Sequence, residues 1–180
     1  IMEVILLCQF YSFPLGSFLS LKLKTQQYKI FRKGNIKVGV FGLGVKLEGL
    51  VGKKYYGETK YLDPVATAQK YADFLRNTKK CDLVVCLSHL GYDYGQSEDL
   101  VSDRKLAAQT HGIDIILGGH THTFLTEPNV LKNSKGVNVL VNQVGWAGIL
   151  LGRIDFYFDK DKKISKVSFQ NQFIDNKIIV

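Results

Sequence analysis

Two short apolar runs, each leading directly to histidine, constrain the fold of this chain more than any other feature. The first is Asp82-Leu-Val-Val-Cys-Leu-Ser-His89, and the second is Asp114-Ile-Ile-Leu-Gly-Gly-His120-Thr-His122. A short apolar run that stops at turn-forming residues is typical of a buried strand in an α/β protein. Open α/β sheets place their ligands at the carboxyl ends of the strands. The two runs therefore predict strands that bring three of the chain's four histidines to one site.

A helix is predicted before each of these strands. Asp63-Pro64 has the pattern of a helix start, with aspartate as the N-cap and proline in the first turn. Ser102 caps a second predicted helix, which Gly112 ends. The apolar face of the first helix has helical spacing and consists of Val65, Ala68, Tyr71, Ala72 and Leu75. Alternation of strands and helices predicts a parallel sheet at the centre of the fold.

The remaining apolar segments read as further strands, three before the helices and four after the second histidine strand. They are 3–10, 27–32, 36–42, 137–144, 149–158, 164–170 and 173–180, and the last four predict a meander that closes a second sheet. Residues 12–25 have no assignable pattern. Gly42 and Gly44 end a strand without a helix following them, which favours a structural turn over a phosphate-binding loop.

Composition fits one folded domain and leaves two interpretations of the charge. The chain has 180 residues, 46% of them hydrophobic, and a net charge of +8. Residues 1–62 hold ten basic and three acidic side chains, a difference of +7. A basic surface could bind nucleic acid or acidic membrane, or the lysines could be solvated positions on strand edges. Because no nucleic-acid-binding motif accompanies these lysines, the second interpretation is preferred and a nucleic-acid partner is not expected.

The order and spacing of these motifs resemble the calcineurin-like dinuclear metallophosphoesterases, in particular their 5′-nucleotidase branch. The resemblance rests on Ser-His-Leu-Gly at 88–91, Gly-Gly-His-Thr-His-Thr at 118–123 and the glycine-rich segment 142–152. It covers residues 28–180, leaves 1–27 uncertain, and implies a layered α/β/β/α sandwich that is truncated at its N-terminal side. It further implies that His89 and His120 bind one metal ion and His122 its neighbour. The residues expected to shape the site are Gly118, Gly119 and Thr121.

The family's other ligands come from an earlier half of its domain, and their motifs cannot be placed in this sequence. They are an Asp-x-His, a Gly-Asp turn and an Asn-His-Glu or Asn-His-Asp turn. This chain has no aspartate before Asp63, no histidine before His89 and, before Asn77, only Asn35 as an asparagine. We therefore expect a partial catalytic domain over residues 1–180, with the catalytic residues in a missing N-terminal part. The family's C-terminal nucleotide-specificity domain is also expected to be absent.

The resemblance implies a metal-dependent hydrolase that converts a nucleoside 5′-phosphate into nucleoside and phosphate through attack by metal-activated water. The complete family site holds two divalent ions, with manganese, zinc, iron and cobalt all possible. Two cations about 4 Å apart repel each other strongly and need carboxylates around them. With histidines alone, we expect the isolated chain to be weakly active or inactive. The alternative is a non-catalytic metal-binding or folded remnant of a truncated gene.

Location and partners follow from the same reasoning. The resemblance implies a periplasmic or cell-surface protein that acts on a small phosphate ester or nucleotide. The apolar run 4–8 lacks the features of a signal peptide and is too short to span a membrane. His111, at the end of the second helix, is predicted to be a surface residue rather than a ligand. Unpaired strand edges of a truncated sheet predict self-association.

Overall fold

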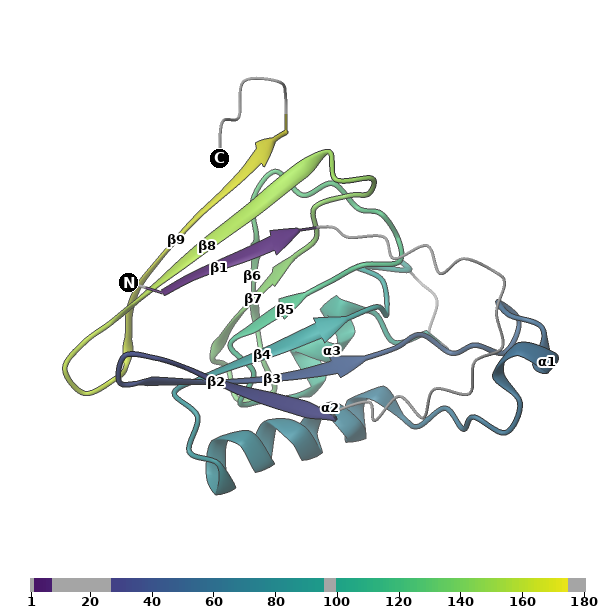
Figure 1. Cartoon of the computed structure of the whole chain (residues 1–180), viewed down its shortest axis with the longest axis horizontal. Coiled ribbons are helices and arrows are strands. Elements are labelled where there is room, and N and C mark those ends of the chain that lie inside the picture. The colour runs from purple at the N-terminus through teal and green to yellow at the C-terminus, as the bar shows by residue number, and fades with distance from the viewer. Residues whose placement is uncertain (1, 8–26, 96–99, 175–180) are drawn as a thin grey trace.

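The computed structural model of the chain describes residues 2–7, 27–95 and 100–174 and arranges them as two sheets with helices on one side (Figure 1). The larger sheet has six strands in the order β2-β3-β4-β5-β7-β6. Their bounds are β2 Tyr28–Lys33, β3 Ile36–Leu43, β4 Leu83–Ser88, β5 Ile115–Leu117, β6 Asn129–Lys132 and β7 Asn138–Asn142. The smaller sheet has the order β1-β8-β9, with β1 Met2–Leu7, β8 Leu150–Phe158 and β9 Ile164–Phe173.

The centre of the large sheet is parallel, as the alternation of strands and helices predicts. Strands β3, β4, β5 and β7 run parallel, whereas β2 and β6 pair antiparallel at the two edges. The helices are α1 Lys53–Tyr56, α2 Pro64–Asp73, the π-helical turn η1 Phe74–Thr78 that continues α2, and α3 Asp103–Gln109. The parallel arrangement matters for function because it brings the carboxyl ends of β4 and β5 to the same edge.

Strand β4 lies between two hydrophobic cores and contributes alternate residues to each. Val84 and Cys86 face the core that α2 and α3 cover. Leu83 and Val85 face the core shared with Ile154 of β8 and its neighbours. The layers are therefore helices, large sheet and small sheet, which confirms the predicted layered α/β architecture (Figure 1). Within the described residues, no second helical layer covers the small sheet.

Both helices begin where their capping residues predict. The Asp63 carboxylate accepts a hydrogen bond of 2.6 Å from the Ala66 backbone N–H, and Pro64 occupies the first turn of α2. The Ser102 hydroxyl accepts one of 3.3 Å from the Lys105 backbone N–H at the start of α3. These caps satisfy backbone groups that a helix start leaves unpaired, so the sequence locates both helices by local chemistry alone.

The prediction for the C-terminal strands was wrong at its first member. The segment at 137–144 was assigned to the second sheet, but β7 pairs with β5 in the large sheet. The reason is burial on both faces: four of the five β7 residues are buried, as in an interior parallel strand. Strand β6 was not predicted at all. The segment 12–25 lies outside the described residues, as does all of the predicted strand 173–180 beyond Ile174.

The helices bear on the expectation about membranes, and the edges of the sheets bear on the expectation about self-association. Among the described helices, none has the length and apolar character that crossing a bilayer would require. Among the described strands, β2 and β6 lie at the edges of the large sheet and β1 and β9 at those of the small one. Self-association through such edges stays a prediction.

Candidate functional site

The carboxyl ends of β4 and β5 bring two of the predicted ligands together. His89 directly follows β4, His120 lies three residues beyond β5, and Leu87 of β4 is the register partner of Leu117 of β5. The centres of the two imidazole rings are 5.2 Å apart, at an angle of 64° between their planes. Neighbouring parallel strands therefore place the two rings side by side, as their sequence positions predict.

The third predicted ligand lies against another partner. The His122 ring stacks on Trp146, with 5.9 Å between ring centres and 17° between the planes. Within the described part of the chain, no three histidine, cysteine, aspartate or glutamate side chains converge as metal ligands would. The roles of His89, His120 and His122 as metal ligands therefore stay predictions.

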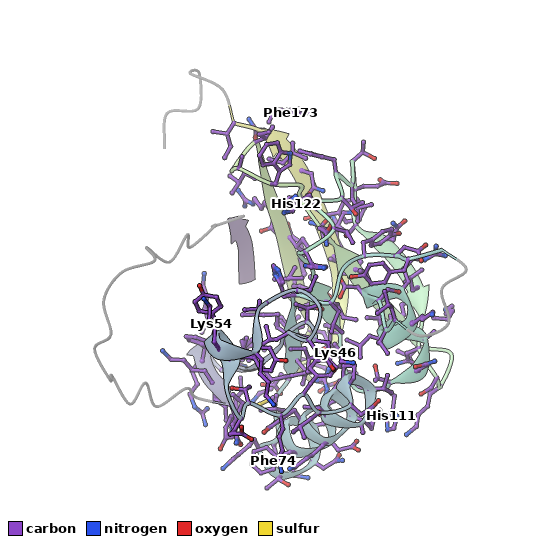
Figure 2. All side chains as sticks on the ribbon, turned by 90° about the vertical axis from the view of Figure 1, so that its right-hand side faces the viewer. Lys46, Lys54, Phe74, His111, His122 and Phe173 are labelled. Carbon is purple, nitrogen blue, oxygen red and sulfur yellow. The ribbon has the colours of Figure 1, made fainter. Side chains whose placement is uncertain are left out.

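The fourth histidine is remote from this group, in accordance with its predicted role as a surface residue. The backbone N–H of His111 donates a hydrogen bond of 2.9 Å to the Gln69 side chain on α2. Its ring lies 3.6 Å from the Asp73 carboxylate. Figure 2 shows His111 and His122 in separate parts of the molecule. His111 is thus a suitable control for experiments on the other histidines.

The environment of His89 favours its neutral form. Partial burial lowers the pKa of His89, and the charges that His120 and His122 can carry lower it further. A neutral imidazole with a free nitrogen is the form that coordinates metal ions.

Both histidines of the His-x-His motif have an unusual backbone conformation. The φ angles are +74° for His120 and +54° for His122, in the left-handed region that disfavours residues with a Cβ atom. Such a conformation costs about 1–2 kcal/mol per residue and occurs preferentially at functional sites. The sequence gives no sign of it, because glycine is the usual residue at a positive φ.

The left-handed conformation of His120 yields a prediction for stability. We expect His120→Gly to be more stable than His120→Ala by about 1 kcal/mol, because only glycine adopts this φ without steric cost. The comparison is made by urea unfolding of both variants. At His111, which has no positive φ, we expect the reverse order. An alanine variant as stable as the glycine variant at position 120 would contradict the assigned backbone conformation.

A buried aspartate connects the two strands that carry the histidines. Asp103, the first residue of α3, accepts a hydrogen bond from the hydroxyl of Ser88, the last residue of β4. Its other carboxylate oxygen lies beside Gly118, where an added Cβ would be only 2.1 Å away. Gly118 directly follows β5. The Asp103 carboxyl thus packs between the ends of the two strands.

The same carboxyl is poorly solvated. Asp103 is fully buried, and its Oδ2 is the one buried side-chain oxygen without a hydrogen-bond partner in the described residues. Burial raises the pKa of Asp103 to about 7, against the opposing effect of the Ser88 hydrogen bond. Removing a carboxylate from water disfavours its charged form, so Asp103 is partly protonated near neutral pH.

Gln143 fixes the loop that carries His120 and His122. Its amide N–H donates a hydrogen bond of 2.6 Å to the Gly119 carbonyl, and its amide oxygen accepts a hydrogen bond of 3.0 Å from the Thr121 hydroxyl. The Thr121 hydroxyl also accepts a hydrogen bond of 2.9 Å from the Tyr92 backbone N–H. Thr121 and Gln143 therefore tie the His-x-His loop to the loop after β4.

Sequence reasoning missed Asp103 and Gln143. Asp103 stands beside the N-cap Ser102, so its acidic charge is accounted for by the helix start. A buried glutamine at the end of an apolar strand, Val139-Leu-Val-Asn-Gln143, is a signal that could have been found. A buried polar side chain needs hydrogen-bond partners, and this one finds them in the site loop.

Nearby carboxylates do not complete a metal centre. Asp93 pairs with Arg104 at 2.5 Å, and Asp114 pairs with Arg76 at the opposite end of its strand. The described residues therefore offer one pair of neighbouring imidazoles, His89 and His120, as candidate ligands. They do not fit a two-ion centre, whose cations need carboxylates between them.

Comparisons with known proteins find sequence similarity to nucleotide phosphoesterases and 5′-nucleotidases. The chain is 32% identical to the trifunctional nucleotide phosphoesterase protein YfkN of Bacillus subtilis, over 69% of this chain and 8% of the relative. It is 30% identical to the snake venom 5′-nucleotidase of Naja atra, over 84% of this chain and 29% of the relative. No protein-family model matches the chain.

Among solved structures, the chain is also similar to a 5′-nucleotidase. The 5′-nucleotidase precursor of Thermus thermophilus superposes with a TM-score of 0.66 at 29% identity, over 82% of this chain and 30% of that one. The calcineurin-like phosphoesterase YfkN of Bacillus subtilis superposes with a TM-score of 0.67 at 22% identity, over 87% of this chain and 53% of that one. Because the identity is so low, this similarity supports the fold alone. The chain is therefore similar in sequence to part of 5′-nucleotidases and of a nucleotide phosphoesterase, and it spans less than a third of the length of these sequence relatives.

Proposed function

We propose that this chain carries the histidine-bearing part of a phosphoester hydrolase of the 5′-nucleotidase type, with nucleoside 5′-phosphates as substrates. The pairing of the His89 and His120 rings at the ends of two parallel strands carries the proposal. The activities for which the relatives are named, 5′-nucleotidase and nucleotide phosphoesterase, support it. Since the chain spans only 8% of one sequence relative and 29% of the other, the proposal concerns the activity of a whole protein.

The chemistry of the donor set specifies the role of this part. Two neutral imidazoles suit an ion such as Zn²⁺ or Co²⁺ better than a hard ion such as Mg²⁺. We assign His89 and His120 to one ion and His122, which would have to leave Trp146, to a second. The carboxylates and the acid that protonates the leaving group are proposed to come from an N-terminal part outside the described residues. The chain by itself should then bind metal without efficient turnover.

Metal titration with an activity assay tests this proposal. The purified chain is titrated with Zn²⁺ and Co²⁺, and hydrolysis of AMP and a chromogenic phosphate ester is measured with each ion and with Mn²⁺. We expect about one ion per chain, binding lost in the His89→Ala/His120→Ala variant and retained in His111→Ala, and little or no turnover. His122→Ala should affect this first ion least.

Two results would count against this assignment. Equal metal binding by the parent and the His89→Ala/His120→Ala variant would place the ligands elsewhere. Rapid turnover that depends on the histidines would show that a complete site assembles without further carboxylates.

A non-catalytic remnant is the second candidate, and the lack of any carboxylate converging on the histidines within the described residues favours it. The coding DNA upstream of residue 1 distinguishes the two. In-frame codons for the Asp-x-His, Gly-Asp and Asn-His-Glu/Asp motifs within ~100–130 codons, the size of half a domain, would support the hydrolase. A stop codon or frameshift would support the remnant.

A further inference from the structure

The stack between His122 and Trp146 is an interaction that the proposed function does not explain. The two rings lie almost parallel, with 17° between their planes and 5.9 Å between their centres. The rings of His89 and His120, in contrast, meet edge to face. Parallel, offset aromatic rings at such a separation attract each other. His122 therefore has a favourable contact that it would lose on joining the other two imidazoles.

Hydrogen bonds fix the backbone that carries the two stacked rings. The Gly145 backbone N–H donates a hydrogen bond of 2.9 Å to the Thr123 carbonyl. The Thr123 backbone N–H in turn donates to the side-chain oxygen of Gln143, which is fully buried. The residue after His122 is thus bonded directly to the residue before Trp146. Pairing of these two segments brings the imidazole and the indole together.

The turn that carries Trp146 also has an unusual backbone. On the far side of the indole, Ala147 has a φ of +58°, in the left-handed region. A residue with a Cβ atom is disfavoured there and persists only where the surrounding contacts impose the conformation. The turn is closed by a hydrogen bond of 3.3 Å from the Ile149 backbone N–H to the Trp146 carbonyl. The position of the indole is therefore determined by this turn.

The imidazole of His122 has two alternative places. With the backbone held on both sides, it can leave the indole only by rotation of its own side chain. His122 is also close enough to His89 for its charge to lower the pKa of that residue. Stacking on Trp146 and approach to the paired imidazoles therefore compete for one side chain.

We propose that Trp146 is a positioning residue, which holds the His122 ring by stacking and keeps it apart from the His89–His120 pair. The stack then opposes recruitment of His122 as a ligand and weakens metal binding at the pair. This consequence rests on the proposed function, whereas the orientation of the ring does not. The stack also gives a physical reason why three histidines of the described chain do not converge.

NMR without metal tests the orientation of the ring. In EDTA, the imidazole protons of the four histidines are assigned in the full chain. The ring current of the indole should shift the His122 protons upfield in the parent. This shift should be lost in Trp146→Leu and largely kept in Trp146→Phe, which restores an aromatic ring. The protons of His111 should not move in any variant, which verifies that each one folds.

Tyr55→Leu is the matched control for the loss of an exposed aromatic ring. Tyr55 lies on α1, is 63% exposed, and has the Lys54 ammonium 4.9 Å from its ring centre. Its replacement should change neither the His122 protons nor the affinity for Zn²⁺.

Calorimetric titration with Zn²⁺ tests the consequence for the site. Trp146→Leu should bind Zn²⁺ roughly two- to tenfold more tightly than the parent, which corresponds to the strength of one aromatic pair. The gain should disappear in Trp146→Leu/His122→Ala, because no third imidazole is left to recruit. Trp146→Phe should bind Zn²⁺ as the parent does.

The outcomes separate this inference from the proposed function. An upfield shift of the His122 protons that is absent from the parent, or that survives in Trp146→Leu, would overturn the positioning role. Equal affinities of the parent and Trp146→Leu, with Zn²⁺ bound by both, would overturn the competition. If no variant binds Zn²⁺ but the shift is lost in Trp146→Leu, the proposed function falls and Trp146 still orients His122.

Discussion

Replacement of Gly118 by alanine is expected to destabilise the fold by about 3 kcal/mol or more, near the upper end of overpacking effects. The added Cβ would lie 2.1 Å from Asp103 Oδ2 and 3.2 Å from Gln143 Nε2. Neither group can move cheaply, because Asp103 is fully buried and Gln143 is hydrogen-bonded to the Gly119 carbonyl. The measurement is urea unfolding followed by circular dichroism.

Two further variants test whether the effect is a steric clash with the carboxyl. Gly44→Ala is the control, since an added Cβ there meets nothing within 4 Å, and it should change stability by less than about 0.5 kcal/mol. In an Asp103→Ala background the clashing oxygen is gone, so Gly118→Ala should cost much less than in the parent. Additive effects in this double-mutant cycle would show that Asp103 does not contact Gly118.

The contribution of Asp103 to the stability of the chain is expected to fall as the pH rises from about 4 to 7. Its pKa is about 7 in the folded chain, whereas an aspartate in the unfolded chain titrates near its ordinary value. Between these values the folded chain binds the proton and the unfolded chain does not, so each increase in pH favours unfolding. The contribution of Asp103 to the free energy of unfolding is fully present below pH 4 and is lost by pH 7–8. The loss is on the order of 3–4 kcal/mol.

Asp103→Asn isolates this effect. Asparagine has nearly the same shape and no titration, so the difference in unfolding free energy between variant and parent should grow in favour of the variant from pH 5 to pH 8. The comparison is made in EDTA by urea unfolding at several pH values. Subtracting the two curves cancels other titrating groups, including His89, whose lowered pKa acts in the opposite direction.

Asp93→Asn is the control for the sign of this effect. The hydrogen bond from Arg104 lowers the pKa of Asp93, so its small contribution is present at neutral pH and lost on acidification. A difference curve for Asp103→Asn that is flat with pH would show that Asp103 is solvated or paired.

The sequence by itself determined the local elements and one pair of site residues. The helix starts at Asp63 and Ser102 follow from capping, which involves residues three apart in the chain. The apolar runs before His89 and His120 form strands, as predicted. Because alternating strands and helices predict parallel pairing, the meeting of these two histidines was predictable without coordinates.

Only the tertiary structure decided which side chains meet across distant segments. It put β7 in the large sheet, set His122 against Trp146, and packed the Asp103 carboxyl between Ser88 and Gly118. None of these contacts leaves a periodic or local signal, because each joins residues through the packing of separate elements. Burial then gave Asp103 its raised pKa, a property of the packed interior that no sequence pattern encodes.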